Sequence, residues 1–405
     1  MDAVPGPNRL PRARHAGCVE IVHASNYAFS SSILAIPNST ILLILLTPYC
    51  LPLNQKMETS ASISQYADHN PYPVGQILRL KAALNNSTPG DYSELLVRVK
   101  RQNRPWTLSC GMVVENLEDV SDSDDDRGLQ QGQGLGNDRE AFLKIFDRRY
   151  AQQLRDDNGI EEWSNLIEQE FLDGIRSGKM DDFLRKLRSD KQFQQDTEDD
   201  WDAAENEAFL WDEVSKCFKS EVAAYSVLTK YQGELIPRLL AEIALDISPP
   251  DPALGAQQQE LSRVKGILLE YLPGFSLSSI TQRAPQAAWQ NIVDQAIKIV
   301  HVLGDNNILN TDVRPDNFVV VPKRRIAQVM DEENSAEYRV FMIDFGQCRL
   351  RREDESDAEW GRAKWIQDEE GAVGAVMRMM LGKIGFELDY RPSWRYLEWA
   401  PGEDD

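Results

Sequence analysis

Apolar and polar residues mix at strand length between residues 74 and 115, a pattern that predicts β-strands. Turn-forming residues at Asn85–Gly90 and Gln102–Pro105 separate these strands. A compact apolar segment further on contains a single lysine, Lys144, among hydrophobic neighbours. The predicted strands are Ile77–Leu80, Leu95–Lys100, Trp106–Val114 and Ala141–Asp147.

Residues 151–205 are rich in charged residues, and their apolar residues recur at helical spacing. We interpret this segment as a helical insertion. A longer helix is predicted from Ala203 to Tyr231, where apolar residues form one stripe. The stripe contains Leu210, Val214, Cys217, Phe218, Tyr225 and Leu228. Glu221 falls on the same stripe, so its carboxylate needs a partner in the folded protein.

The remainder of the chain contains both strand and helix patterns. The predicted strands are Ile236–Ile243, Val264–Leu269, Phe318–Val321 and Phe341–Ile343. The predicted helices are Ala287–Leu303 and Glu359–Leu381. A connector that resembles a hinge, Glu270–Gly274, follows the second of these strands.

At 405 residues the chain is long enough for one large domain or two smaller ones. Its 42% hydrophobic and 27% charged residues are typical of a soluble globular protein. A net charge of −21 and a pI near 4.7 argue against generic nucleic-acid binding, which needs a basic face. An acidic surface also disfavours attachment to anionic membranes. We therefore expect no nucleic acid and no membrane among its partners.

Cysteine and histidine are sparse. The chain has five scattered cysteines without paired spacing, which argues against a disulfide framework or a structural zinc site. Four histidines make a His-dependent triad or a multi-His metal site difficult to assemble. The simplest environment is reducing and intracellular, either cytoplasmic or nuclear.

Residues 1–70 predict an N-terminal extension without stable structure. Its apolar segment, Ile41–Leu46, is too short to span a bilayer, and Pro37 and Pro48 flank it. A late signal anchor is one interpretation of this segment. We favour a buried or disordered tail, or a translated segment upstream of a start at Met57.

Two acids and one amide stand beside short apolar strands in the second half of the chain. Asn317 follows Asp312 by five residues and precedes one strand, and Asp344 ends the next strand. Oxygen ligands of this kind are those that Mg²⁺ prefers, so we expect Asn317 and Asp344 to bind metal. Asp312 is suited to act as the base. A buried Lys144, paired with Glu221, is suited to bind the phosphates of a nucleotide. The pattern predicts phosphoryl transfer with ATP and Mg²⁺ as cofactors.

These residues resemble the motifs of the protein kinases. Asp312–Asn317, which is D-V-R-P-D-N, is similar to the catalytic-loop pattern D-[LIV]-[KR]-P-[ED]-N, and Asp344–Gly346 matches the D-F-G motif. The further similarities are Lys144 to the strand lysine, Glu221–Tyr225 to its helical partner, and Leu268–Gly274 to the hinge. The resemblance spans roughly residues 74–381. It implies an α+β, bilobal protein kinase-like fold with a helical insertion in the N-lobe and a shortened, mainly helical C-lobe.

The resemblance also implies roles for single residues. Arg314 would help to neutralise the transferred group. Leu269 would be the gatekeeper, and Glu270 and Leu272 would lie at the adenine. The implied boundaries are 1–70 for the extension, 71–272 for the N-lobe with the insertion 151–205, 273–385 for the C-lobe, and 386–405 for a C-terminal tail.

The chain departs from the family pattern in several places. No G-x-G-x-x-G lies between the first two strands, and the glycines from Gly128 to Gly136 follow them in what we interpret as a linker. Asn310-Thr311 replaces His-Arg before the catalytic acid, so we do not expect control by a phosphorylated activation loop. No A-P-E motif follows the D-F-G motif. Asp368–Gly374 weakly resembles the buried helix that anchors the catalytic loop, which implies a short activation segment.

Simpler alternatives exist for these residues. Asp312 and Asn317 are also favourable in an ordinary turn, and Lys144 could lie at an exposed strand edge. Glu213, two turns before Glu221, competes with it as the helical partner. For function, we favour a protein Ser/Thr kinase-like phosphotransferase, with a protein substrate. The alternatives are a pseudokinase or nucleotide-binding scaffold, and a kinase that acts on a small-molecule hydroxyl.

Overall fold

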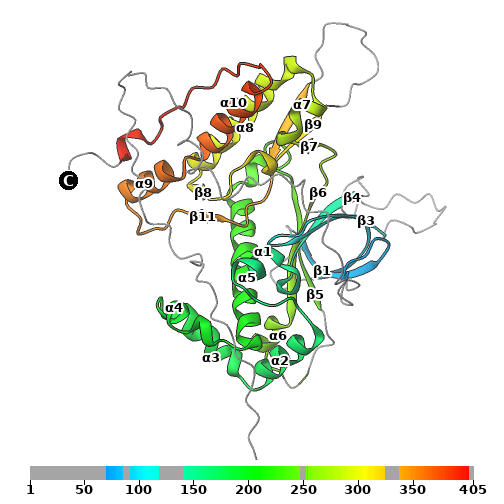
Figure 1. The fold of residues 1–405 in the computed structure, drawn as a ribbon. Helices are drawn as coiled ribbons and strands as arrows, with labels where there is room; N and C mark the ends of the chain where they lie inside the picture. The colour runs from blue at the N-terminus through cyan, green and yellow to red at the C-terminus, as the bar shows by residue number, and fades with distance from the viewer. Residues whose placement is uncertain are drawn as a thin grey trace, which may run out of the picture. The chain divides into compact units, whose positions relative to one another are not determined.

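The computed structural model describes residues 70–84, 92–117, 140–246, 252, 254–323 and 337–400 (Figure 1). The chain divides into two units, Met1–Pro71 and Tyr72–Asp405, and the second unit holds every described helix and strand. The predicted extension up to residue 69 and the glycines from Gly128 to Gly136 lie outside the described residues. The described part combines helices with antiparallel strands and is of the α+β class.

Six antiparallel strands close into a barrel in the order β1-β2-β3-β4-β6-β5, with β5 returning to β1 (Figure 1). They are β1 (Ile77–Leu84), β2 (Ser93–Asn103), β3 (Cys110–Asn116), β4 (Glu140–Phe146), β5 (Leu239–Asp246) and β6 (Arg263–Glu270). Alternate residues fill the interior, among them Leu80, Met112 and Leu143. The strand predicted from Trp106 begins only at Cys110, because the buried Trp106 ring packs in the preceding turn against Tyr150.

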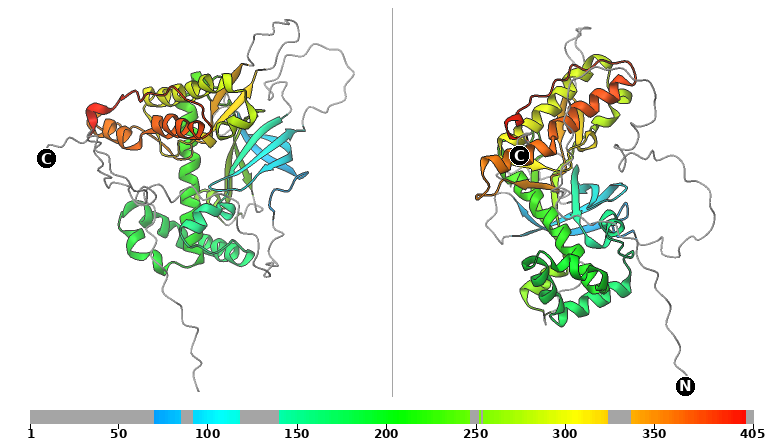
Figure 2. Two further views of the ribbon diagram at one scale, coloured as in Figure 1. Left: turned by 45° about the horizontal axis from the view of Figure 1, so that its top comes forward. Right: turned by 60° about the vertical axis from the view of Figure 1, so that its left-hand side comes forward.

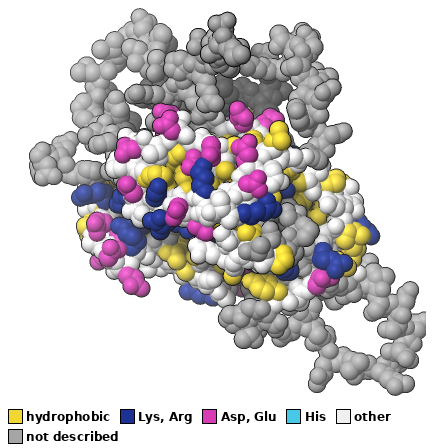
Figure 3. Space-filling view, turned by 90° about the horizontal axis from the view of Figure 1, so that it is seen from below, with side chains coloured by type: hydrophobic (Ala, Val, Ile, Leu, Met, Phe, Trp, Pro, Cys, Tyr) yellow, Lys and Arg dark blue, Asp and Glu magenta, His cyan; other side chains and the backbone are white. Residues whose placement is uncertain are grey.

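The predicted insertion is helical. It follows η1 (Arg148–Tyr150) and contains α1 (Gln152–Asp157), α2 (Asn165–Arg176), α3 (Lys179–Ser189), α4 (Phe193–Thr197) and η2 (Glu198–Asp200). Helix α6 (Ala256–Leu261), from later in the chain, lies beside α2. The long helix α5 (Ala203–Val227) follows. It begins at a capping box in which Asp202 and Glu205 bond each other's backbone N–H groups. Figure 3 views the molecule from below Figure 1 and shows acidic and basic side chains interspersed on that face.

The second half of the unit is a helical layer with two small sheets (Figure 2). Its strands are β7 (Phe275–Ser276), β8 (Ile308–Asn310), β9 (Phe318–Pro322), β10 (Tyr338–Met342) and β11 (Cys348–Leu350). Its helices are η4 (Leu277–Ser279), α7 (Ile280–Arg283), η5 (Gln286–Ala288), α8 (Trp289–Asp305), η6 (Pro315–Asn317), α9 (Asp357–Gln367), α10 (Glu369–Gly382) and η7 (Leu397–Trp399), with η3 (Thr229–Tyr231) after α5. The apolar face of α8 lies in the core that these elements share. None of the described helices has the length and apolar character needed to cross a bilayer.

The last helix differs from its prediction. A single helix was expected over Glu359–Leu381, but the chain breaks at Asp368, which has a left-handed φ of 43°. Its side chain accepts a bond from the Gly371 N–H and so starts a second helix, α10. The described part of the predicted tail also packs against the unit, since Leu388 and Tyr390 are buried.

The contact between β4 and β6 yields a first prediction. A Cβ atom added at Gly266 would lie 2.5 Å from the Lys144 carbonyl oxygen, whereas one at Gly382 would meet nothing within 4 Å. Gly266→Ala should therefore lower the free energy of unfolding by about 3 kcal/mol, since the neighbouring strand must move. Gly382→Ala, the control, should change it by less than about 0.5 kcal/mol. Equal melting curves for the two variants would contradict the packing described.

Candidate functional site

The segment that begins at Asn310 is anchored by a buried polar network. β8 pairs with β11, which brings Asn310 opposite Cys348. The Asn310 N–H donates to Glu369 Oε1 at 2.8 Å, and the Asp312 N–H donates to Asn310 Oδ1 at 2.8 Å. Lys364 is paired with Glu369 and donates to the Ile308 carbonyl oxygen at 3.1 Å. Residues of α9 and α10 therefore hold the backbone that presents Asp312.

Asp312 lies in a local cluster with Asn317 and Arg314. Asn317 Nδ2 donates to the Asp312 carbonyl oxygen at 2.8 Å and to Asp312 Oδ2 at 3.0 Å. An Arg314 guanidinium nitrogen lies 3.3 Å from Asp312 Oδ2. Burial raises the pKa of Asp312, although Arg314 and Asn317 oppose this shift. The carboxyl thus combines partial burial with an orienting amide, which suits a group that handles a proton.

Antiparallel pairing brings Asn317 and Asp344 to the same end of two strands. Phe318 of β9 lies opposite Met342 of β10, and the next bond runs from the Ile343 N–H to the Asn317 carbonyl oxygen at 2.9 Å. Asp344 has a left-handed φ of 66°, which is uncommon for a residue other than glycine. A backbone outlier of this kind supports a functional hypothesis for Asp344.

Lys144 joins the barrel to this site. Its Nζ lies 2.5 Å from Glu221 Oε2 on α5 and 2.9 Å from Asp344 Oδ1. Burial disfavours the charged lysine, but Asp344 and Glu221 outweigh it and the pKa of Lys144 is raised. Burial would raise the pKa of Asp344, yet Lys144 holds it below its usual value. The competing Glu213 is instead bound to Lys216 at 2.6 Å, so the helical partner of Lys144 is Glu221.

The predicted adenine residues lie where β6 ends. Leu269 is buried in the main core and faces Phe142 of β4 in the strand register. The Glu270 carboxylate is bound to Arg238, which donates its backbone N–H at 3.1 Å and Nε at 3.2 Å. A contact between Glu270 and a nucleotide would therefore come from its backbone. Leu272 is half-buried just beyond the strand.

Sequence reasoning did not single out Phe142 and Gly111. Gly111 of β3 is the register partner of Lys144, and a Cβ there would meet the Phe142 ring at 2.8 Å. Phe142 precedes Lys144 by two residues and therefore projects from the same face of β4. The aromatic ring thus takes space next to the lysine that a side chain at position 111 would otherwise fill. Strand alternation could have placed Phe142 on this face, but not against Gly111.

The turn between β2 and β3 carries no glycine cradle. It borders a hollow of about 490 Å³ lined by Arg104, Pro105, Trp106, Tyr150 and Gln152. The Arg104 guanidinium stacks 3.5 Å from the centre of the Trp106 ring. The Gln153 N–H donates to the Thr107 carbonyl oxygen, which ties this turn to α1. The Arg104–Trp106 stack and this hydrogen bond therefore hold the turn that leads to Gly111, the register partner of Lys144.

The donor set at Asn317 and Asp344 fits a hard cation. Among the described residues, no three His, Cys, Asp or Glu side chains are grouped to hold a metal ion. Mg²⁺ commonly binds one or two protein carboxylates, with phosphates and water completing its shell. The Asn317 amide gives its NH₂ group to Asp312, which directs its oxygen away from that carboxylate. Asn317 and Asp344 would hold the ion, and the ion would supply charge compensation for phosphate oxygens.

Lys144→Met should lower the free energy of unfolding by about 3 kcal/mol or more at pH 8, because Glu221 would remain as a buried charge without its cationic partner. The loss should be smaller at pH 5: burial raises the pKa of Glu221, so a proton can neutralise it as the pH falls. Lys144→Met with Glu221→Leu should recover part of the loss. Urea unfolding of the wild type and both variants at pH 8 and pH 5 measures these free energies. A pH-independent loss would contradict the buried pair.

No family model and no curated protein matches the chain.

Proposed function

We propose that the chain is an ATP- and Mg²⁺-dependent phosphotransferase with a protein kinase-like, bilobal fold, and that it acts on a protein Ser/Thr hydroxyl. The observation that carries the proposal is the bridge of Lys144 between Glu221 and Asp344. Three segments far apart in the sequence meet at this bridge. A lysine that pairs with a helical glutamate beside a metal-binding aspartate is the arrangement that kinase catalysis requires.

In this proposal Asp312 belongs to the same site as Lys144, Glu221 and Asp344. Asp344 raises the pKa of the Asp312 carboxyl and Lys144 lowers it, although burial is the larger cause of its shift. Asp312 would orient the acceptor hydroxyl and take its proton, and Arg314 would stabilise charge on the transferred group. Lys144 would hold phosphate oxygens, with Glu221 keeping its ammonium in place.

The overall architecture supports the proposal in part. The barrel carries Lys144 and leads through Glu270 into the helical layer that carries Asp312. Glu369 anchors the loop from the start of α10, as the resemblance of Asp368–Gly374 implies. A closed six-stranded barrel is not typical of the kinase fold, but it leaves β4 and β6 adjacent, as the assignment needs.

A nucleotide-binding or scaffold protein without transferase activity is the second candidate. The Phe142 ring beside Gly111 favours it, because the ring takes space next to Lys144. The turn between β2 and β3 also lacks glycine and packs against α1. Binding and chemistry therefore need separate tests. Identifying the phosphorylated product distinguishes a kinase that acts on a small-molecule hydroxyl from one that acts on a protein.

ATP with Mg²⁺ should raise the melting temperature by about 5 °C at saturating nucleotide. Asp344→Asn should remove the part of the shift that depends on Mg²⁺, because it takes a carboxylate from the ion. Asp354→Asn is the matched control, since Asp354 is exposed and pairs only loosely with Arg352. A thermal-shift titration with and without Mg²⁺ measures both. A full Mg²⁺-dependent shift in Asp344→Asn would refute the metal assignment.

Asp312→Ala should reduce phosphate transfer about 1000-fold, because the loop would lose its proton acceptor. Transfer is measured as autophosphorylation by mass spectrometry, with Asp354→Asn as the control that keeps wild-type activity. Mg²⁺-dependent ATP binding without any transfer in the wild type would establish the scaffold function instead. Equal transfer in wild type and Asp312→Ala would exclude Asp312 as the base.

A further inference from the structure

Helix α5 belongs to two hydrophobic cores. Its first half contributes Ala208, Phe209 and Leu210 to a core shared with α2, α3 and α6 of the insertion. Its second half contributes Phe218 and Tyr225 to the main core. Figure 1 shows the helix running from the insertion helices up to the level of β11. A rigid helix held in both cores transmits a displacement of one end to the other.

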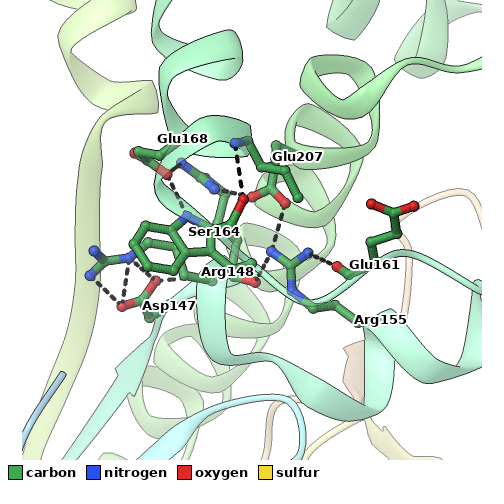
Figure 4. A network of polar contacts seen from close by, with 10 residues as sticks. Asp147, Arg148, Arg155, Glu161, Ser164, Glu168 and Glu207 are labelled. Atoms are coloured by element: carbon green, nitrogen blue, oxygen red, sulfur yellow. Dashed lines mark hydrogen bonds and ion pairs between the residues drawn. The ribbon is translucent and has the colours of Figure 1, made fainter. Parts of the chain in front are cut away.

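A buried carboxylate fastens the first half of α5. Glu207 is fully buried, and each of its oxygens binds a different arginine (Figure 4). Arg155 of α1 donates to Oε1 at 2.6 Å, and Arg148 of η1 pairs with Oε2. Arg155 also donates to the Glu161 carbonyl oxygen at 2.8 Å. Buried charges with this many partners are costly to separate, so the joint is rigid.

The same arginines connect the insertion to the strand that carries Lys144. Arg148 follows Lys144 by four residues and also lies 2.6 Å from Glu168 of α2. Its guanidinium stacks 4.0 Å from the centre of the Phe171 ring. A further tie runs from α3, where Arg188 donates to an oxygen of Asp212 on α5 at 2.6 Å.

Glu207 and Glu221 lie on the same side of α5. They are fourteen residues apart, 221 minus 207, which is close to four turns and about 21 Å along the axis. One buried acid meets Arg148, and the other meets Lys144 on the strand just before it. Two buried ion pairs, Lys144–Glu221 and Arg148–Glu207, therefore join α5 to the segment that runs from β4 into η1. Arg155 of the insertion is the second partner of Glu207.

We propose that the helical insertion 151–205 positions Glu221 for Lys144 by clamping the start of α5 through Glu207, Arg148 and Arg155. The clamp makes the Lys144–Glu221 pair a built-in feature of this chain, formed without a partner protein or a phosphorylated segment. Glu207, Arg148 and Arg155 are positioning residues. The consequence for catalysis rests on the proposed function, whereas the position of α5 is testable without it.

Cys217 reports the position of α5 directly. It lies one turn before Glu221, is half-buried, and its Cβ would be 3.5 Å from a Cβ placed at Gly346. Glu207→Gln should loosen the clamp and raise the iodoacetamide labelling rate of Cys217 about tenfold, as followed by peptide mass spectrometry. Arg185→Ala is the matched control, because Arg185 and Asp182 form an exposed pair within α3. It should leave the rate unchanged.

The outcomes separate the clamp from the phosphotransferase. Faster Cys217 labelling in Glu207→Gln supports the clamp whether or not the wild type transfers phosphate; where it does, kcat should fall about tenfold with it. Faster hydrogen exchange in 165–189 with unchanged Cys217 labelling would show that the insertion is a separate structural module, and would overturn the proposal. If Glu207→Gln does not fold, Arg155→Lys, which removes one of the two guanidinium groups bound to Glu207, carries the test. About threefold faster labelling supports the clamp, and an unchanged rate overturns it.

Discussion

The structure depends on one buried ammonium group. Lys144 stands on a strand of the barrel, and its charge is balanced by Glu221 from α5 and Asp344 from the loop after β10. A buried charge is unfavourable unless oppositely charged groups and hydrogen bonds surround it. The three elements must therefore meet in one arrangement for the charge to be satisfied. Barrel, helix and loop are held in register by this requirement.

A second buried pair performs a similar task for the loop. Lys364 on α9 donates to the Ile308 carbonyl oxygen, and Glu369 on α10 accepts from the Asn310 N–H. Burial raises the pKa of Glu369, and Lys364 opposes that shift. Asn310, in the place where the kinase pattern has histidine, uses its side chain to hold the Asp312 N–H. The loop that differs from the family pattern is thus ordered by other polar contacts.

Periodicity located most of the elements. The strand that contains Lys144, the helical insertion and the stripe of α5 are all present near their predicted bounds. The break at Asp368 was not predictable from apolar spacing, because the pattern continues through it. Closure of the barrel depends on the pairing of β1 with β5, which are more than 150 residues apart in the chain (239 minus 84 is 155). Contacts at that separation leave no local signal.

The sequence by itself determined which residues carry the candidate chemistry: Asp312, Asn317 and Asp344 beside apolar strands, and Glu221 as a charge on an apolar stripe. Local patterns suffice there, because strand and helix periods are properties of neighbouring residues. Only the tertiary structure decided that Glu221, and not Glu213, meets Lys144. It alone set Phe142 against Gly111 and Glu207 between two arginines. Those choices depend on how distant segments pack, and packing is decided by the whole chain.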